Sequence, residues 1–588
     1  MTRLDRQSPA AIATAIRGGK TSALKVAQET LARLDAYDKV QPQIWISRAA
    51  PTELLAAARA VDARIAAGEQ LPLAGVPFAV KDNIDVAGFE TTAGCPAFAY
   101  SPAASATVAE QLLAAGAICV GKTNLDQFAT GLVGTRSPYG IPRNAYNLAY
   151  VSGGSSSGSA VAVAAGLVGF ALGTDTAGSG RVPAAFNHLV GFKPTKGRWS
   201  TQGLVPACRT IDCITVFTDN LSDARLVDDV LAGFDPADPY SKPLANVSLQ
   251  PTRIGVPRRD QRAWFGDSQS EYLYDQAIAR LAADAEIIEL DISPLNEAAS
   301  LLYNGPWVAE RTAAIENLLA NKPDAIDETV RQITEAGLRK TAVEVFNGIY
   351  RLADLKRQAD ALWNEVDMLA FPTTGTTYRV AELLAAPIAL NSNLGFYTNF
   401  VNLLDMAAVA VPAGTRSNGT GFGITLIGAA DSDHALLDAA ETYRGTVELP
   451  APPELDLEGK MESVKLAVVG AHLKDMPLHW QLTSRDAEFV GSFETAPTYR
   501  LYAIADSVPP KPALVHSGDG ASIKVEVYQL DVSAFGSFVA EVPAPLAIGN
   551  VTLADGTTVK GFVAESRATD GAEDITDLGG WRAYIEAK

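Results

Sequence analysis

The pattern of apolar and polar residues predicts helices that alternate with short strands along most of the chain. Helical periodicity with a polar start covers Ser22 to Tyr37 and Thr52 to Ala67. Short apolar runs that predict strands occupy Gly75 to Val80, Ala117 to Val120 and Arg253 to Val256. Further stretches with helical periodicity lie at 268–284, 297–320, 324–337 and 340–365. This alternation favours an α/β fold with helices on the faces of a sheet.

The composition changes at Val447 to Glu458, where prolines are interspersed with acidic residues. Such a segment is typical of a stiff, solvated connection. New strand patterns follow it at Leu466 to Leu473 and Ile523 to Tyr528. We therefore predict three parts: an α/β domain at 1–446, a proline-rich linker at 447–460 and a smaller α+β domain at 461–588.

The overall composition is typical of a globular protein. Of 588 residues, 47% are hydrophobic and 20% are charged, and this length exceeds what one ordinary core holds. The net charge of −19 argues against nucleic acid and anionic membranes as partners. An anionic substrate would therefore need a local cationic group.

Targeting and metal-binding signals are not found in the sequence. Met1 to Gln7 lacks the apolar core of a signal peptide, and the longest apolar run, Ala160 to Gly173, is shorter than the ~20 residues of a membrane-spanning helix. We therefore expect a cytoplasmic protein. We also expect reduced thiols and neither metal nor cofactor, because no cysteine or histidine has disulfide-framework or metal-ligand spacing. These residues are Cys95, Cys119, Cys208, Cys213, His188, His434, His472, His479 and His516.

Candidate catalytic chemistry lies in three separate segments. Lys81 follows an apolar strand, a Gly/Ser-rich run covers 153–159, and Ser179 lies in a Gly/Thr/Ser-rich turn. A serine hydroxyl needs a base to become a nucleophile, and a desolvated neutral lysine can serve as that base. A lone lysine is usually a surface residue, but the apolar strand before Lys81 predicts burial. The sequence thus predicts a proton relay from Ser179 through Ser155 to Lys81.

Other interpretations of the Gly/Ser-rich run remain open. It could be a flexible linker, although a strongly apolar helical run follows it directly. A phosphate-binding loop is disfavoured because no Lys-Ser/Thr pair follows the glycines. The run also contains a Gly-x-Ser-x-Gly pattern, which makes Ser156 an alternative nucleophile with His188 or His434 as its base.

These motifs occur together with further segments in a fixed order. The segments are Leu73 to Asn83, Gly121 to Asp126, Val190 to Thr195 and Asn402 to Pro412. From about residue 10 to about residue 445, the chain resembles the amidase signature family. The resemblance implies a mixed sheet surrounded by helices and a Ser-cisSer-Lys triad, with Ser155 after a cis peptide. It also implies that the oxyanion hole is formed by the backbone N–H groups of Thr176, Ala177, Gly178 and Ser179.

Three positions depart from the usual pattern of this family. Ser157 and Ala177 stand where glycine is more common, so each adds a Cβ where φ could be special. Gly180 follows the nucleophile in place of a bulkier apolar residue. We expect effects on local loop geometry and none on the triad.

Two segments and the C-terminal domain resemble the branch of the family that hydrolyses allophanate (urea-1-carboxylate). The segments are Thr130 to Ser137 and Leu302 to Arg311. In this interpretation Arg311 clamps the substrate carboxylate and Tyr303 adds a phenolic hydrogen bond. The alternative is an ordinary helix-surface arginine and a packing tyrosine. The resemblance implies ammonia and N-carboxycarbamate as first products, within urea or s-triazine degradation.

The C-terminal domain resembles the γ-glutamyl cyclotransferase-like fold through a strand followed by Gly470 to Leu473. Val469 replaces the tyrosine of the cyclotransferase motif, so that activity is not expected. His472 is favoured over His479 as a catalytic candidate that helps to decarboxylate the first product. A structural or dimerising role is the alternative, and we expect a homodimer.

Two other functions remain possible. A general amidase, or the A-type subunit of a tRNA-dependent amidotransferase with partner chains, would use the same triad, but the acidic chain and the extra domain disfavour the tRNA-dependent enzyme. In a non-enzymatic interpretation the C-terminal domain binds a partner and the triad is a relic, which the intact triad opposes.

Overall fold

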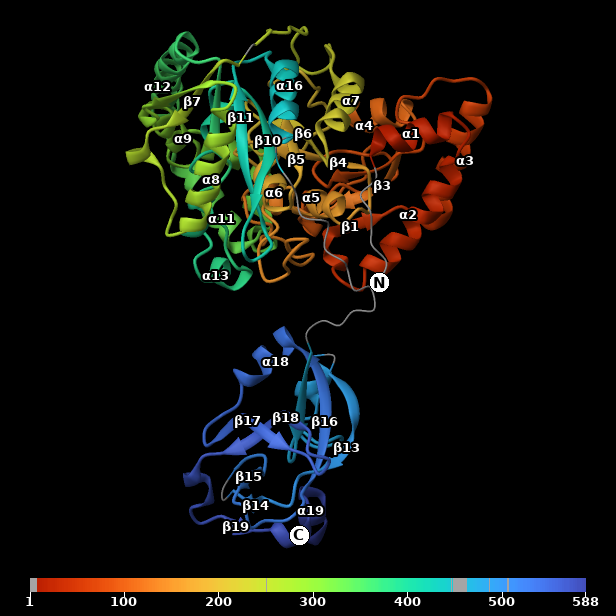
Figure 1. The fold of residues 1–588 in the computed structure, drawn as a ribbon, viewed down its shortest axis with the longest axis vertical. Coiled ribbons are helices and arrows are strands. Elements are labelled where there is room, and N and C mark those ends of the chain that lie inside the picture. Colours follow the sequence, from red (N-terminus) through yellow and green to blue (C-terminus); the bar gives the residue numbers. More distant parts are fainter. Residues whose placement is uncertain (1–7, 250, 446, 448–462, 486, 505–506) are drawn as a thin grey trace. The chain divides into compact units, whose positions relative to one another are not determined.

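The computed structural model describes residues 8–249, 251–445, 447, 463–485, 487–504 and 507–588. The chain divides into two compact units, Met1–Leu457 and Glu458–Lys588 (Figure 1). Most of the predicted linker and the segment Met1 to Gln7 lie outside the described residues, so the predicted boundaries stay a prediction. Within the described ranges, every helix is too short or too polar to span a lipid bilayer.

The N-terminal unit is built on one mixed sheet of eleven strands. In spatial order the strands are β1 (Trp45–Arg48), β3 (Ile118–Thr123), β2 (Pro77–Lys81), β4 (Phe170–Asp175), β6 (Cys213–Thr218), β5 (Val190–Lys193), β10 (Ala407–Thr415), β11 (Gly421–Gly428), β9 (Met368–Pro372), β7 (Arg253–Pro257) and β8 (Glu286–Leu290). β2 runs parallel to β3 and β4, whereas β4, β6, β5, β10 and β11 pair antiparallel in succession. The predicted α/β class with a mixed sheet is confirmed.

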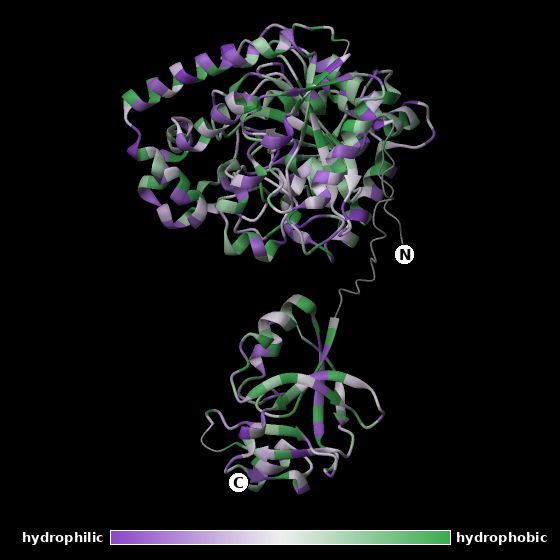
Figure 2. Cartoon of the chain, turned by 60° about the vertical axis from the view of Figure 1, so that its left-hand side comes forward, coloured by the Kyte–Doolittle hydropathy of each residue, from purple (hydrophilic) through white to green (hydrophobic). Residues whose placement is uncertain are grey.

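The periodic segments near the N-terminus form helices at the expected positions. α2 (Ala23–Tyr37) begins after Ser22, whose hydroxyl accepts from the N–H of Lys25. α3 (Pro51–Ala66) starts on a proline, which suits the first turn of a helix. Figure 2 shows polar and apolar residues alternating around such helices, while the strands inside the unit are mostly apolar.

The apolar run that begins at Ala160 does not form one continuous element. Its first part belongs to α5 (Ser157–Ala164), all eight residues of which are buried, and its last part is in β4. α5 contacts β2, β4 and β6. A helix made only of small and apolar residues can be buried on all sides in this way.

The predicted single helix at 297–320 is wrong. The structure has α9 (Ser293–Asn304) and α10 (Trp307–Asn321), separated at Gly305 and Pro306. Proline disfavours helical geometry in the residue before it, so the chain turns at this point. The remaining predicted helices are α8 (Ser268–Leu281), α11 (Glu328–Glu335) and α12 (Ala342–Ala361).

The C-terminal unit has its own apolar core and is rich in strands. Five strands form one sheet in the order β13 (Glu488–Glu494), β16 (Lys524–Asp531), β12 (Ser463–Val468), β18 (Thr558–Ala564) and β17 (Leu546–Thr552). Three more strands pair in the order β15 (Pro512–His516), β14 (Tyr499–Ala503) and β19 (Glu573–Asp574), and the helices are α17 (Trp480–Thr483), α18 (Val532–Val539) and α19 (Trp581–Ala587). A separate, smaller domain is confirmed, and its likeness to the cyclotransferase-like fold stays a prediction.

Candidate active site

Lys81 is the last residue of β2 and is fully buried. Its Nζ donates to Ser155 Oγ and to Thr174 Oγ1, both at 2.7 Å. The neighbouring carboxylate of Asp82 does not neutralise it, because Asp82 forms a buried ion pair with Lys122 at 2.9 Å. Lys81 therefore has neutral hydroxyl partners, which suits a lysine that acts as a base.

Burial favours the neutral form of Lys81. Burial lowers the pKa of Lys81 to about 7. Three carboxylates act in the opposite direction, those of Asp126, Asp212 and Asp175, and the Arg311 guanidinium adds to the lowering. A base whose pKa lies near neutrality is what general base catalysis requires.

Ser155 lies in the tight turn before α5, after a cis peptide bond from Gly154. Its carbonyl oxygen accepts from the N–H of Asp126 at 3.0 Å. A Cβ on Gly154 would lie 2.1 Å from Asp126 Oδ2 and 2.6 Å from the nitrogen of Gly134, so only glycine fits there. The turn thus presents the Ser155 hydroxyl to Lys81.

Ser179 follows β4 and is buried, with 2% of its surface exposed. β2 and β4 are parallel neighbours, so Lys81 and Ser179 belong to the same edge of the sheet. Among the hydrogen bonds of the described residues, Ser179 Oγ donates to the Gly131 carbonyl oxygen at 3.5 Å and forms none with Ser155. The Ser155–Lys81 contact of the predicted relay is present as a hydrogen bond. The Ser179–Ser155 contact needs the Ser179 hydroxyl to turn, and catalytic hydrogen bonds often tighten only when substrate binds.

Asp175 organises the loop that carries Ser179. Its carboxylate accepts from the N–H groups of Gly178 (2.8 Å) and Gly180 (3.1 Å) and from Arg181 through two bonds of 2.9 and 3.0 Å. Burial alone would raise the pKa of Asp175, but Arg181 and these donors hold it below its ordinary value.

This arrangement narrows the predicted set of oxyanion-hole donors. The Gly178 N–H is directed at Asp175 Oδ1, so including Gly178 in the oxyanion hole does not fit this geometry. The N–H groups of Thr176, Ala177 and Ser179 make no hydrogen bond to another described residue outside the sheet. These three remain the candidate donors for an oxyanion.

The three departures from the family pattern have simple explanations. Neither Ser157 nor Ala177 is among the described residues with positive φ, so a Cβ is tolerated at both positions. A Cβ on Gly180 would lie 2.7 Å from Thr215 Cγ2, which excludes a bulkier residue there.

The alternative nucleophile Ser156 is not placed for catalysis. Its hydroxyl donates to the Thr174 carbonyl oxygen and accepts from the Thr174 N–H, both at 3.2 Å, which ties the loop to β4. His188 Nε2 lies 3.3 Å from the Gly419 carbonyl oxygen, and His434 pairs with a buried carboxylate. Both histidines thus have hydrogen-bond partners other than Ser156.

Among the described residues, one group of side chains could hold a metal ion. It consists of Asp228, Asp229 and His434, whose possible ligand atoms lie within 4.8 Å of one another. Arg198 donates to both carboxylate oxygens of Asp228, at 2.6 and 2.9 Å. A guanidinium therefore already occupies the place of a cation, and we assign no metal to this group.

Arg311 lies on α10 and is buried, with 2% of its surface exposed, so the helix-surface interpretation is wrong. Its Nη1 donates to Thr130 Oγ1 at 3.1 Å, and its guanidinium lies 5.2 Å from the ring centroid of Tyr303. The Nε and Nη2 groups have no hydrogen-bond partner among the described residues. Buried charged donors are normally satisfied, so this pair is suited to a carboxylate.

Thr130 connects this cation to the nucleophile. The residue after it, Gly131, provides the carbonyl oxygen that accepts from Ser179. Asp126 holds the loop that follows Gly131 in place, since its Oδ2 accepts from the N–H groups of Val133 and Gly134, each at 3.0 Å. Sequence patterns did not identify Asp126 and Thr130 as individual site residues, although both lie in segments that resemble the family.

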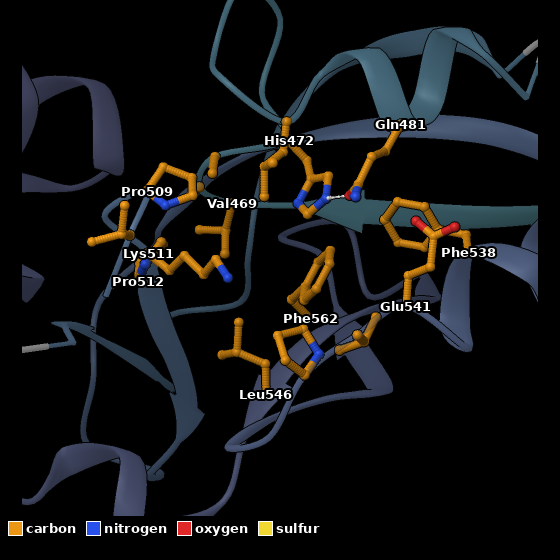
Figure 3. Close-up of a pocket in the computed structure, with 16 residues that line it drawn as sticks. Val469, His472, Gln481, Pro509, Lys511, Pro512, Phe538, Glu541, Leu546 and Phe562 are labelled. Atoms are coloured by element: carbon orange, nitrogen blue, oxygen red, sulfur yellow. Dashed lines mark hydrogen bonds between the residues drawn. The ribbon is translucent and has the colours of Figure 1, made fainter. Parts of the chain in front are cut away.

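In the C-terminal unit, His472 lines a cavity of about 250 Å³ (Figure 3). Its Nε2 lies 2.7 Å from Gln481 Oε1, and its ring stacks on Phe562 with centroids 5.0 Å apart. Lys511 and Glu541 line the same cavity, and neither stood out in the sequence. Burial lowers the pKa of His472, and the Lys511 charge contributes to that lowering.

The second histidine candidate has a different environment. His479 Nε2 lies 3.1 Å from the hydroxyl of Tyr528, which also donates to Glu526 at 3.1 Å. His479 is not among the residues that line the cavity around His472. The two histidines can therefore be tested separately.

Comparisons with known proteins give matches to both units. The amidase family model matches residues 28–437, and the allophanate hydrolase C-terminal domain model matches residues 464–586. Allophanate hydrolase of Kluyveromyces lactis has a similar structure, with 41% identity, a TM-score of 0.71 and 99% of each chain covered. Urea amidolyase of Saccharomyces cerevisiae is 45% identical over 549 residues, which cover 88% of this chain but 30% of that protein. A glutamyl-tRNA(Gln) amidotransferase chain of Chloroflexus aggregans is 34% identical over 76% of this chain and 97% of its own length.

Proposed function

This chain belongs to the amidase family and carries an allophanate hydrolase C-terminal domain, and from that premise we propose that it is an enzyme that hydrolyses allophanate. The observation that supports this proposal most is the buried Arg311, whose Nε and Nη2 have no hydrogen-bond partner among the described residues. Its Nη1 binds Thr130, the residue before Gly131, which contacts Ser179. Similarity to an allophanate hydrolase covers both units, whereas similarity to the amidotransferase chain covers about three quarters of this one. A general amidase or a tRNA-dependent function is therefore less well supported.

In the proposed first step, Ser179 Oγ attacks the terminal ureido carbonyl carbon of allophanate. Its proton passes through Ser155 to Lys81, and the substrate carboxylate is held by Arg311 and Tyr303. The backbone N–H groups of Thr176, Ala177 and Ser179 stabilise the oxyanion. The tetrahedral intermediate collapses, the C–N bond breaks and the proton leaves with ammonia. Water then hydrolyses the acyl-enzyme to release N-carboxycarbamate.

We propose that the C-terminal unit assists the next step. N-carboxycarbamate is a dicarboxylate that takes up one proton at nitrogen and loses CO2 to give carbamate. The cavity of His472 offers the ammonium of Lys511 to a carboxylate and the imidazole of His472 to relay the proton (Figure 3).

We further propose that the protein acts in the cytoplasm as a homodimer. Support for a protein contact comes from α12, where three large apolar side chains are exposed at helical spacing: Val343, Phe346 and Tyr350, with exposed fractions of 70%, 55% and 63%. The inner face of α12 packs at Gly348 against Pro306, in the corner between α9 and α10 that carries Tyr303 and Arg311.

The proposed substrate is tested by ammonia release from allophanate, malonamate and glutamine. We expect kcat/KM for allophanate to exceed that for glutamine by at least about 100-fold. A buried site built for particular charged contacts discriminates strongly against a substrate that cannot make them. Malonamate keeps the carboxylate and should be an intermediate substrate. A preference for glutamine would contradict the proposal and favour the amidotransferase function.

The role of the C-terminal unit is tested in the full chain by His472→Ala. The first equivalent of ammonia should appear at the wild-type rate, while enzymatic CO2 release falls by roughly 100-fold, a usual contribution of an acid–base group. Build-up of the dicarboxylate can be followed by ¹³C NMR. His479→Ala is the matched control, since His479 lies outside the cavity. Wild-type CO2 release by a folded His472→Ala protein would leave the unit with a structural role.

A further inference from the structure

Asp212 is a buried carboxylate that the proposed relay does not use. It is 4% exposed and directly precedes β6. Its Oδ1 accepts from the Thr176 hydroxyl at 2.5 Å, and its Oδ2 accepts from the N–H groups of Ala207 (2.8 Å) and Cys208 (3.1 Å). Asp212 therefore contacts both the loop at 207–208 and Thr176, the first residue of the loop at 176–179 that we call the oxyanion loop.

The β4–β6 ladder explains this contact. Asp175, the last residue of β4, pairs with Cys213, the first residue of β6. The preceding residue, Asp212, is thereby brought next to the residue that follows Asp175, which is Thr176. Asp175 holds the far part of the loop through Gly178 and Gly180, so the near part depends on Asp212.

We propose that Asp212 is a positioning residue for catalysis, which in its ionised form fixes Thr176 and thereby aims the oxyanion-hole N–H groups at the reacting carbonyl. This inference rests on the proposed amide hydrolysis and deepens it. Three donors converge on the carboxylate, and a protonated Asp212 would replace one acceptor lone pair by an O–H group. Ionised Asp212 satisfies all three donors.

The charged groups around Asp212 act in both directions. Burial raises the pKa of Asp212 to about 6, against the lowering by the Thr176 hydroxyl, the Cys208 N–H and Arg311. Lys81 at the end of β2 interacts with Asp212, and so does Arg311 on α10. The carboxylate of Glu310 instead accepts hydrogen bonds from the N–H and the hydroxyl of Thr210, both at 2.8 Å.

Asp212 also affects the base, because its charge raises the pKa of Lys81. Removing that charge should lower the pKa of Lys81. The acid limb of the pH profile, where Lys81 loses its proton and activity rises, should then move to lower pH. A residue that only stabilises the fold would not move this limb.

The test compares Asp212→Asn, Thr176→Val and Thr176→Ser in the full chain, with kcat, KM and pH profiles measured on malonamate and propionamide. For Asp212→Asn we expect kcat to fall by roughly 10- to 100-fold, less than or similar to the loss of one oxyanion donor, with KM changed by less than about threefold. The acid limb of the pH profile of Asp212→Asn should shift to lower pH. Thr176→Val should lower kcat without moving the limb, and Thr176→Ser, which keeps the hydroxyl, should lower kcat much less than Thr176→Val.

Asp238→Asn is the matched control. Asp238 is equally buried at 4% and accepts from the Thr201 N–H and hydroxyl at 2.6 and 2.9 Å rather than from Thr176. Its kcat should stay near wild type. Wild-type kcat and an unmoved limb in Asp212→Asn would overturn the proposal, as would equal damage by Thr176→Ser and Thr176→Val if Asp212→Asn does not fold. Propionamide keeps this outcome separate from the substrate question, since the oxyanion loop serves any amide.

Discussion

Ser179→Ala and Lys81→Ala are each expected to lower kcat for ammonia release from allophanate by on the order of 10,000-fold or more. Ser179 is the proposed nucleophile, and Lys81 is the buried base hydrogen-bonded to Ser155 at 2.7 Å. A conservative Lys81→Arg change should be equally inactive, because a guanidinium stays charged at neutral pH. The measurement is the steady-state rate of purified, folded variants.

The same base sets the expected pH dependence of the wild type. Only the neutral amine accepts a proton, and burial places the pKa of Lys81 at about 7. Activity should therefore rise with increasing pH through about 7 and be lost below it.

The controls are His188→Ala and His434→Ala, which should keep a substantial fraction of kcat. Both histidines have hydrogen-bond partners outside the serine loop, the Gly419 carbonyl oxygen for His188 and the Asp228 carboxylate for His434. A folded histidine variant without activity, together with an active Lys81→Ala protein, would refute the relay. Ser156 would then be the better candidate for the nucleophile.

Local patterns predicted the elements that carry the triad. The apolar run before Lys81 and the buried α5 after the serine turn are encoded within short windows of sequence, so periodicity and flanking glycines sufficed. The break at Gly305 and Pro306 was also visible in the sequence, but helical periodicity on both sides concealed it.

Contacts between distant segments could not be read in the same way. The Arg311–Thr130 hydrogen bond joins residues 181 positions apart, and the burial of Arg311 depends on how the corner between α9 and α10 packs. Asp212 reaches Thr176 only because β4 and β6 are paired. In the C-terminal unit, Lys511 and Glu541 come to His472 through tertiary packing, so no spacing signal exists.

Arg311→Ala is expected to lower kcat/KM for allophanate by well over tenfold. Hydrogen bonds to a charged group contribute roughly 1.5 to 3 kcal/mol, which corresponds to about 10- to 150-fold. Propionamide, which has no carboxylate, should lose much less. Tyr303→Phe keeps the ring beside the guanidinium and removes only the hydroxyl, so it reports the phenolic hydrogen bond separately.

Two effects of Arg311 must be separated, because its charge also lowers the pKa of Lys81. Without Arg311 the pKa of Lys81 should rise, so more of the base is protonated near neutral pH. Measurement at about pH 9, where Lys81 is largely neutral in both proteins, removes most of this contribution. The substrate-specific loss should persist there.

Arg339→Ala is the matched control for net charge, since Arg339 is an exposed arginine that follows α11. It should leave both substrates nearly unaffected. If Arg311→Ala lowered kcat/KM equally for allophanate and propionamide at high pH, Arg311 would not anchor the carboxylate. Its buried guanidinium would then serve the packing of the corner with Tyr303, and the preference for an anionic amide would need another source.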